Sequence, residues 1–433
     1  MRRLLVLVLL AACTMLAACG SGGGPGDGGA DPPAAATPPG QGAGAAATRG
    51  RAAPDPAADP VVHVRALARI ARAHGGTRAA GTPAARASED YVAARLAAVG
   101  YTVRRQAVPF LFFDERRPPR VRAGTVRVRA RTMAYSPGGR AAGPVVAVGL
   151  GCTARAVAAL PRGAVALARR GICPFRQKAR LAQAAGAAAV LVADRGAEPV
   201  SATLGAPGLR IPALAVGAPG ARALTRAGRA SVRVDAVSER RVTHNVIGEQ
   251  PGAPQRTVML GAHLDSVPAG PGINDNGSGT AAVLAAAERL AAARVRGVRV
   301  AFWGAEELGL YGSRRYVASL APAARRALVA YLNFDMVASP GGRARVYDTD
   351  DRVERVLRGA LRTAGSRPGE ERLGASSDHA SFARAGSPVG GIFTGLDRCY
   401  HRACDDGGNV DASLLRTVTE AVTEAARRLS KAS

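Results

Sequence analysis

The segment that decides the fold contains "TVMLGAHLD" (257–265), "SGTAAVLAAAERLAAA" (278–293) and "VRVAFWGAEE" (298–307). The first and last of these are short apolar runs that end in polar residues, as buried strands do. The middle segment has the length and apolar pattern of a helix. A strand, a helix and a second strand in this order predict a parallel pair, with the polar residues at the carboxyl edge of the sheet.

The same alternation continues on both sides of this segment. "ALVAYLNFDMV" (327–337) predicts a further strand. Nearer the start of the chain, 61–76 has apolar residues at helical spacing, and 87–108 predicts a helix followed by a strand. We therefore expect an α/β fold built from 61–111 and 242–433, in which helices flank a mixed, largely parallel central sheet.

The chain between 112 and 241 has a different pattern. Short strand-like runs follow one another there, such as "PVVAVGL" (144–150) and "AAAVLVAD" (187–194). One or two helices interrupt them, the clearest being "FRQKARLAQAAGA" (175–187). This pattern predicts a small β-rich domain inserted into the larger α/β domain.

The first 19 residues, "MRRLLVLVLLAACTMLAAC", predict an export signal, because two Arg precede an apolar stretch and small residues. The stretch is too short for a stable membrane span. "LAAC" at 16–19 resembles a bacterial lipobox, in which Cys19 would carry a lipid; a cleaved signal with an incidental Cys is the alternative. Residues 20–60, rich in Gly, Pro and Ala, predict a flexible linker. We expect an extracytoplasmic bacterial protein, lipid-anchored to the membrane or secreted.

The chain is strongly basic, with 59 Lys and Arg against 32 Asp and Glu and a formal net charge of +27. Lys occurs only at 178 and 431, so nearly all of this charge is Arg. The Arg residues are spread along the chain without dense runs or interleaved aromatic residues, as a GC-rich genome would also produce. We therefore expect no nucleic-acid partner, and no feature of the sequence indicates an obligate protein partner.

Four cysteines lie beyond the export segment: Cys152, Cys173, Cys399 and Cys404. An even number outside the cytosol predicts two disulfides. Sequence alone does not fix the pairing, although proximity favours Cys399–Cys404 and leaves Cys152–Cys173. A zinc–thiolate site is the alternative, but the sequence has no CxxC pair.

A set of His and acidic residues follows the predicted strands or lies in Gly-rich loops: His263, Asp265, Asp275, Glu306, Glu307, Asp335 and His401. Imidazole nitrogens and carboxylate oxygens are ligands that zinc takes at about 2.0–2.2 Å. The carboxylates outnumber what one ion needs, so a two-metal site with a bridging carboxylate fits better. A further carboxylate would then accept a proton from the attacking water.

In this order, the motifs H-x-D, D-N-x-S-G, E-E-x-G, D-M, S-D-H and Y-H resemble the co-catalytic zinc aminopeptidases. That metallopeptidase family includes the bacterial leucyl aminopeptidases and, more distantly, glutamate carboxypeptidase. The resemblance covers about 61–111 and 242–433. It implies an enzyme with two zinc ions per chain, which releases the N-terminal residue of peptide substrates; the start of the sequence predicts that this enzyme is exported.

The resemblance also implies a role for each site residue. The metal ligands would be Asp275 as the bridge, His263 and Asp335 on one ion, and Glu307 and His401 on the other. Glu306 would be the general base for a zinc-bridging hydroxide. Asp265 would hydrogen-bond His263 and fix its tautomer, and Tyr400 would contact the substrate carbonyl or the oxyanion.

The inserted domain has a resemblance of its own. The run "GAVALARRGICPFRQKARLAQAAGAAAVLVAD" (163–194) resembles a protease-associated (PA) domain, a non-catalytic module often inserted into such peptidases. The resemblance implies a disulfide between Cys152 and Cys173.

Ser376 is a departure from the family pattern, because relatives often have Arg just before "SDH". This departure leaves the substrate preference open. A carboxypeptidase of the same superfamily, a glutaminyl cyclase with a single zinc and an inactive binding module remain alternatives.

Overall fold

The computed structural model describes residues 59–251, 256–372 and 374–431. The expected export segment 1–19, with Cys19, lies outside these residues, as does the linker up to residue 58. No helix in the described ranges is both long enough and apolar enough to cross a membrane.

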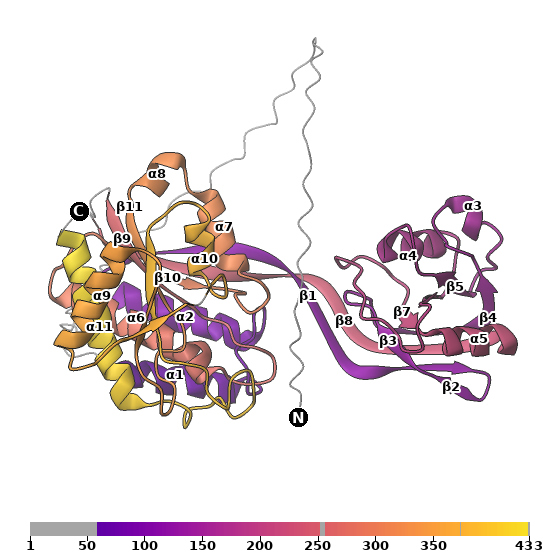
Figure 1. Ribbon diagram of the computed structural model, residues 1–433, viewed down its shortest axis with the longest axis horizontal. Helices are drawn as coiled ribbons and strands as arrows, with labels where there is room; N and C mark the ends of the chain where they lie inside the picture. The colour runs from indigo at the N-terminus through magenta and orange to yellow at the C-terminus, as the bar shows by residue number, and fades with distance from the viewer. Residues whose placement is uncertain (1–58, 252–255, 373, 432–433) are drawn as a thin grey trace, which may run out of the picture. The chain divides into compact units, whose positions relative to one another are not determined.

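A mixed sheet forms the centre of the larger α/β domain (Figure 1). Its parallel core has the order β14 (Val389–Phe393), β11 (Leu328–Phe334), β9 (Thr257–His263), β10 (Val298–Trp303). β8 (Arg229–Glu249) pairs antiparallel with β10. At the other edge β12 (Arg345–Tyr347) pairs antiparallel with β14 and parallel with β13 (Gly369–Glu371). The prediction of a mixed, largely parallel sheet is confirmed.

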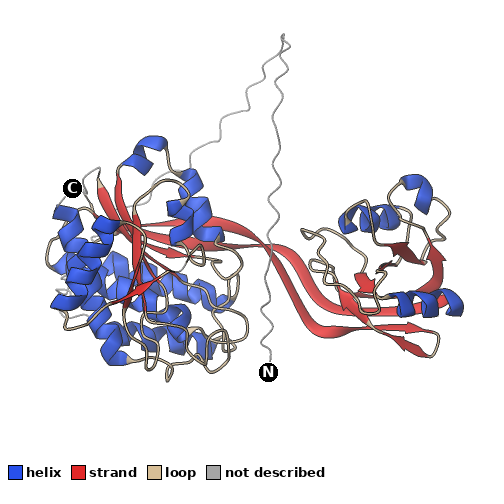
Figure 2. Cartoon of the chain, in the orientation of Figure 1, coloured by secondary structure: helices blue, strands red, loops and turns tan. Residues whose placement is uncertain are grey.

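Helices cover both faces of this sheet, as Figure 2 shows. One face packs against α1 (Pro60–Ala73), α2 (Pro83–Ala98), α6 (Gly279–Ala292), α9 (Asp351–Thr363) and α11 (Ala412–Lys431). The other packs against α7 (Tyr311–Ser319) and α10 (His379–Ala383). Successive strand residues point to opposite faces, so Phe302 joins the first core and Trp303 the second. The short α8 (Pro322–Arg326) precedes β11.

Two long antiparallel strands link this domain to the inserted one. β1 (Thr102–Ala123) pairs with β8 from Thr102↔Glu249 to Ala123↔Ala230. The domain boundaries expected after residues 111 and 241 fall inside these continuous strands. The exact division of the chain into domains stays a prediction.

The inserted domain has its own small sheet. Its parallel strands are β4 (Gly139–Ala147), β5 (Val165–Arg169), β6 (Ala189–Ala193) and β7 (Ala213–Val216). The short β2 (Val126–Val128) and β3 (Ala130–Thr132) pair antiparallel with β1 and β7. Three helices accompany these strands where one or two were expected: α3 (Ala154–Val157), α4 (Phe175–Ala184) and α5 (Ala218–Ala227). α3 is a single turn, and α5 has Pro219 and Gly220 in its first turn, a pair that is typical of turns in sequence.

Disulfides close one loop in each domain. Cys152 is bonded to Cys173 in the inserted domain, with a sequence separation of 21 residues. Cys399 is bonded to Cys404 after β14, with a separation of 5 residues. This is the pairing that proximity favoured.

Candidate active site

The carboxyl ends of three adjacent parallel strands form the floor of the candidate site. β9 ends at His263, Glu306 and Glu307 follow β10, and Asp335 follows β11. β9 lies between β10 and β11, so these side chains meet at one edge of the sheet. They are well shielded: the exposed fraction is 1 % for the His263 side chain and 9 % for Glu306.

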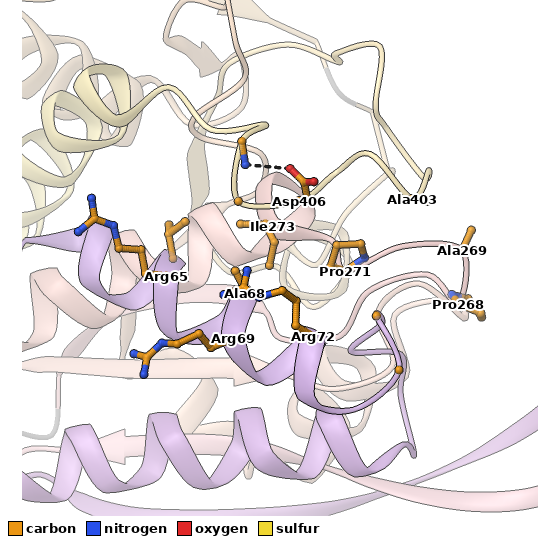
Figure 3. A pocket seen from close by; sticks show the side chains of 15 residues that line it. Arg65, Ala68, Arg69, Arg72, Pro268, Ala269, Pro271, Ile273, Ala403 and Asp406 are labelled. Carbon is orange, nitrogen blue, oxygen red and sulfur yellow. Dashed lines mark hydrogen bonds between the residues drawn. The ribbon is translucent and has the colours of Figure 1, made fainter.

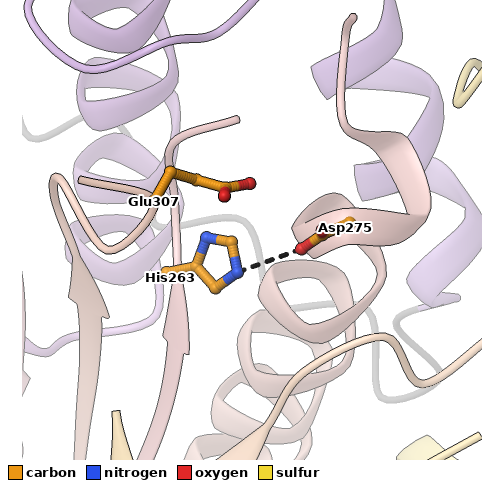
Figure 4. Close-up of side chains that lie close together, drawn as sticks. All are labelled: His263, Asp275 and Glu307. Atoms are coloured by element: carbon orange, nitrogen blue, oxygen red, sulfur yellow. Dashed lines mark ion pairs between the residues drawn. The ribbon is translucent and has the colours of Figure 1, made fainter. Parts of the chain in front are cut away.

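Asp275 lies between the two histidines that the sequence singled out. Its Oδ1 is 3.2 Å from His263 Nε2, and its Oδ2 is 3.2 Å from His401 Nε2. Figure 4 shows the first of these contacts, with the Glu307 carboxylate beside the same two side chains; ligand atoms of all three residues lie within 4.8 Å of one another. A single carboxylate thus offers one oxygen to each imidazole, the arrangement that a bridging ligand requires.

One more carboxylate completes each half of the cluster. Asp335 Oδ1 is 3.3 Å from His263 Nε2, and Glu307 Oε2 is 3.2 Å from His401 Nε2. Ligands about 2.0 Å from a tetrahedral zinc ion are about 3.3 Å from one another. The separations of these atoms therefore fit metal coordination. In addition, Asp335 Oδ1 and Glu307 Oε1 are buried with no hydrogen-bond partner among the described residues.

The cluster gathers more negative charge than its neighbourhood offsets. Burial raises the pKa of Glu307 to about 7, although its hydrogen bond with His401 acts in the opposite direction. Burial and neighbouring carboxylates hold the pKa of Glu306 well above its usual range. Hydrogen bonds with Asp275 and Glu307 raise the pKa of His401 to about 10. Several shifted pKa values in one cluster are typical of a functional site, and bound cations would relieve the repulsion between the carboxylates.

Asp265 departs from its expected contact. Its carboxylate Oδ1 lies 3.8 Å from His263 Nδ1, too far for a hydrogen bond. The backbone carbonyl of Asp265 accepts the Nδ1–H instead, at 3.1 Å, which leaves the Nε2 lone pair facing Asp275 and Asp335. The tautomer is thus fixed by the main chain of this residue. The carboxylate accepts the backbone N–H of Glu306 at 3.1 Å.

The loop that carries Asp275 is held by Asp405. The Asp405 carboxylate accepts the backbone N–H groups of Asn274, at 2.8 Å, and of Asp275, at 3.0 Å. Asn409 donates to the same carboxylate at 2.9 Å. Asp405 is therefore a support of the bridging residue.

A chain of buried polar side chains stands behind Asp335 and was not predicted. Ser377 donates to Asp335 Oδ2 at 2.7 Å, and Asn333 donates to Ser377 at 2.9 Å. Tyr331 donates to Asn333, and Trp303 donates to Tyr331. These contacts fix the orientation of the carboxylate from the interior of the sheet. The one available signal was Ser377, inside the "SDH" motif.

Tyr400 and His401 form the exposed rim of the site. Tyr400 is 37 % exposed, and its ring stacks on that of His401 with centroids 3.8 Å apart. Both residues lie within the loop closed by Cys399 and Cys404. His401 has a φ of 58°, a conformation that costs a non-glycine residue about 1–3 kcal/mol and is found mainly at functional sites.

A separate cavity of about 860 Å³ contains none of these residues (Figure 3). It is lined by one side of α1, by segment 268–273, which leads to Asp275, and by segment 403–408, which follows His401. Its charged lining is mainly Arg65, Arg69 and Arg72. The candidate active site is therefore assigned from the side chains at the sheet edge, and this cavity is not part of it.

Comparisons with known proteins agree with this geometry. The model of peptidase family M28 matches residues 245–426, and that of the PA domain matches 141–224. The probable lipoprotein aminopeptidase LpqL of Mycobacterium tuberculosis is 38% identical over 368 residues, covering 78% of this chain and 73% of that protein. An aminopeptidase of Pseudomonas aeruginosa is 34% identical over 426 residues, covering 84% and 79%.

Solved structures give the same answer. An aminopeptidase from Aneurinibacillus sp. strain AM-1 superposes with a TM-score of 0.58 at 27% identity, covering 87% of this chain and 94% of that one. BSAP, a zinc aminopeptidase from Bacillus subtilis, gives 0.57 at 25% identity, covering 85% and 94%. On the family match, the two relatives and this shared fold, the chain belongs to peptidase family M28 and is a metallopeptidase with a PA domain.

Proposed function

We propose that this protein is an exported aminopeptidase that hydrolyses the N-terminal residue of peptides with two zinc ions. The observation that carries the proposal is the position of Asp275, with one carboxylate oxygen 3.2 Å from each of two imidazole nitrogens. The aminopeptidase names of the Mycobacterium and Pseudomonas relatives support the activity, and the Bacillus structure supports the choice of zinc.

In this proposal the ligands form two groups that share Asp275. His263 and Asp335 would hold one ion with Asp275, and His401 and Glu307 would hold the other. Zinc bound there would polarise the scissile carbonyl and lower the pKa of a water molecule.

Glu306 is the general base in this mechanism. Its backbone N–H is fixed by the Asp265 carboxylate, and burial raises the pKa of its own carboxyl group above the usual range. The residue before it, Ala305, has a φ of 57°, so the chain turns sharply between β10 and the base. Glu306 would take the proton of the attacking water and pass it to the leaving amine nitrogen.

Tyr400 would stabilise the oxyanion that forms on the substrate carbonyl. Burial and the nearby carboxylates raise the pKa of its phenol, so the hydroxyl stays protonated at neutral pH and can donate a hydrogen bond. Its exposed position at the rim leaves it accessible to a substrate.

The restriction to the first residue of a peptide would come from charge. A free α-amino group is positively charged and would be held by the carboxylates of Glu306 and Asp335. A peptide whose N-terminus is acylated lacks that charge and would bind poorly.

Export and anchoring are part of the same proposal. The basic and apolar start of the sequence, with Cys19 after small residues, supports a lipid anchor, and one relative is named a lipoprotein. Two disulfides suit an oxidising compartment. Detergent partitioning of the full chain tests the anchor, since Cys19→Ala should move the protein from the detergent phase to the aqueous phase.

The activity is tested with aminoacyl substrates and their N-acetylated counterparts, with and without a chelator. We expect cleavage of the free-amine substrates alone, loss of activity on chelation, and two zinc ions per chain by elemental analysis. Equal cleavage of N-acetylated peptides would reject the aminopeptidase assignment. A single zinc ion per fully active chain would reject the two-zinc assignment.

A further inference from the structure

Arg78 is a fully buried cation in the loop between α1 and α2, and no motif pointed to it. Its exposed fraction is 0 %. Its guanidinium donates to three backbone carbonyls: from Nε to Pro271 at 2.9 Å, from Nη2 to Gly272 at 2.5 Å, and from Nη1 to Leu264. A guanidinium group is rigid and planar, so three carbonyls bonded to it are fixed relative to one another.

These three carbonyls lie at the two ends of one loop. Leu264 stands between His263 and Asp265, whereas Pro271 and Gly272 lead into the turn that carries Asp275. The Gly272 carbonyl also accepts the backbone N–H of Gly277, on the far side of Asp275. Arg78 thus connects the end of β9 to both sides of the bridging residue.

Further contacts join the Arg78 segment to the same loop. The Arg78 backbone N–H donates to Ser266 Oγ at 2.9 Å, and that hydroxyl donates to the Gly270 carbonyl at 2.9 Å. Thr77 donates to the Val267 carbonyl at 3.0 Å. The loop between the two ligand-bearing segments is therefore bonded along its length to residues 77 and 78.

The charge of Arg78 is not needed to satisfy these neutral acceptors. A buried cation costs several kcal/mol unless a nearby negative charge offsets it. The carboxylates whose field favours the charged form are those of the site and its support, Asp265, Asp405, Asp275 and Glu307. The side chain therefore belongs, both by its contacts and by its charge, to the carboxylate cluster.

We propose that Arg78 is a positioning residue for the metal centre, which fixes the distance between His263 and Asp275 before any metal binds. This inference rests on the proposed function, because it assigns Arg78 an effect on the affinity for the zinc ions proposed there. Supports behind metal ligands typically change metal affinity by about 10–100-fold when they are substituted.

The chain offers a matched control in the PA domain. Arg176 also bonds three backbone carbonyls, those of Leu204, Ala206 and Pro207. It is half-buried in α4, and all three of these acceptors belong to the PA domain. A substitution there removes the same kind of clamp without touching the loop between His263 and Asp275.

The test compares zinc affinity, by competition with a chromogenic chelator, in the unsubstituted protein, Arg78→Lys and Arg176→Lys. Lys keeps the charge but loses the planar fork. We expect about 10–100-fold weaker zinc binding in Arg78→Lys and no change in Arg176→Lys. At a zinc concentration that saturates Arg78→Lys, kcat and KM should return close to the values of the unsubstituted protein.

Three outcomes separate the possibilities. Unchanged zinc affinity in folded Arg78→Lys overturns the inference while leaving the proposed function intact, and so does an equal loss in Arg176→Lys. Absence of zinc binding in the unsubstituted protein rejects the proposed function itself. If Arg78→Lys does not fold, Ser266→Ala replaces it in the test. This substitution removes the hydroxyl between Arg78 and Gly270 and should weaken zinc binding to a smaller degree. Unchanged zinc affinity in Ser266→Ala would overturn the inference.

Discussion

The α/β domain and the PA domain both contain adjacent parallel strands, yet the carboxyl edges of their sheets differ in chemistry. In the first, His263, Glu306 and Asp335 meet at the ends of neighbouring strands. In the second, the residues after β5 and β6 form one surface pair, Arg170 with Asp194 at 3.1 Å. The comparison teaches that the architecture provides an edge, and that the residues placed there decide whether it is a site.

The two domains also use buried cations differently. Lys178 in the PA domain donates to the carbonyls of Leu150 and Gly171 and lies 3.4 and 3.2 Å from the two disulfide sulfurs. It supports the loop around the Cys152–Cys173 disulfide. Arg78 bonds carbonyls in the same way, but those carbonyls flank candidate metal ligands.

Metal removal should have the largest effect on activity, and it should act only at the sheet edge of the α/β domain. Dialysis against a chelator is expected to abolish peptidase activity, and zinc should restore it. Zinc at 100 times its Kd would stabilise the folded chain by about 2.7 kcal/mol, so the Tm should also fall on chelation and recover with zinc. Asp194→Asn in the PA domain should respond identically; activity that survives complete removal of metal would contradict the two-zinc mechanism.

Glu306→Gln tests the proposed general base at the sheet edge of the α/β domain. The amide cannot accept the proton, so kcat should fall by about 10²–10⁴-fold. Zinc content should be unchanged, because Glu306 is not among the proposed ligands. Asp194→Asn is the matched substitution at the sheet edge of the PA domain and should leave kcat as it was. Full activity in Glu306→Gln would reject the assigned role.

Removal of one disulfide should mainly affect activity, and removal of the other should mainly affect stability. Replacing Cys399 and Cys404 with Ser frees the loop that holds Tyr400 and His401, so kcat/KM should fall by about 10–100-fold. The Cys399–Cys404 disulfide spans 5 residues, which implies that it stabilises the folded chain by about 2 kcal/mol. The Cys152–Cys173 disulfide spans 21 residues, which implies about 3 kcal/mol.

The double Ser variant at Cys152 and Cys173 should therefore lose more stability and little activity. Urea unfolding and steady-state kinetics on both variants check this crossed pattern. Equal kinetic effects would mean that the loop of residues 399–404 does not hold the site.

The smallest effect concerns a carboxylate whose charge is fully offset. In α11, Arg427 and Arg428 lower the pKa of Glu424 to about 2, below its ordinary value of 4.5. A depressed folded pKa gives stability that is present above the unfolded pKa and lost as pH falls through the folded pKa. The difference in unfolding free energy between the protein and Glu424→Gln should shrink from pH 4.5 to about pH 2. A difference that is constant over this range would show that the Arg pairs contribute nothing.

The secondary structure around the site could be predicted from sequence because its causes are local. Strand length, apolar runs and the polar residues that end them are visible in the segments at 257–265, 298–307 and 327–337. The α/β fold follows from their alternation with helices. The carboxylates and histidines stood out because so many of them follow predicted strands, and the ordered motifs supplied the family.

The supports of the site needed the tertiary structure. Asp405 bonds a residue 131 positions away, and Arg78 bonds one 193 positions away. Neither contact leaves a local pattern, since Arg is abundant along the chain and an Asp in a loop usually caps its own turn. The oxygen of Asp265 that meets His263 also needed the tertiary structure, because it depends on how β10 lies beside β9.

The sequence by itself thus indicated which residues are of the types that bind metal and which segments form strands, because both follow from residue type and short-range order. Only the tertiary structure decided how those residues are held. The buried chain from Trp303 to Asp335, the Asp405 cap and the Arg78 clamp all join distant segments. Buried polar groups must find partners wherever folding places them, and that placement is a property of the whole packed molecule.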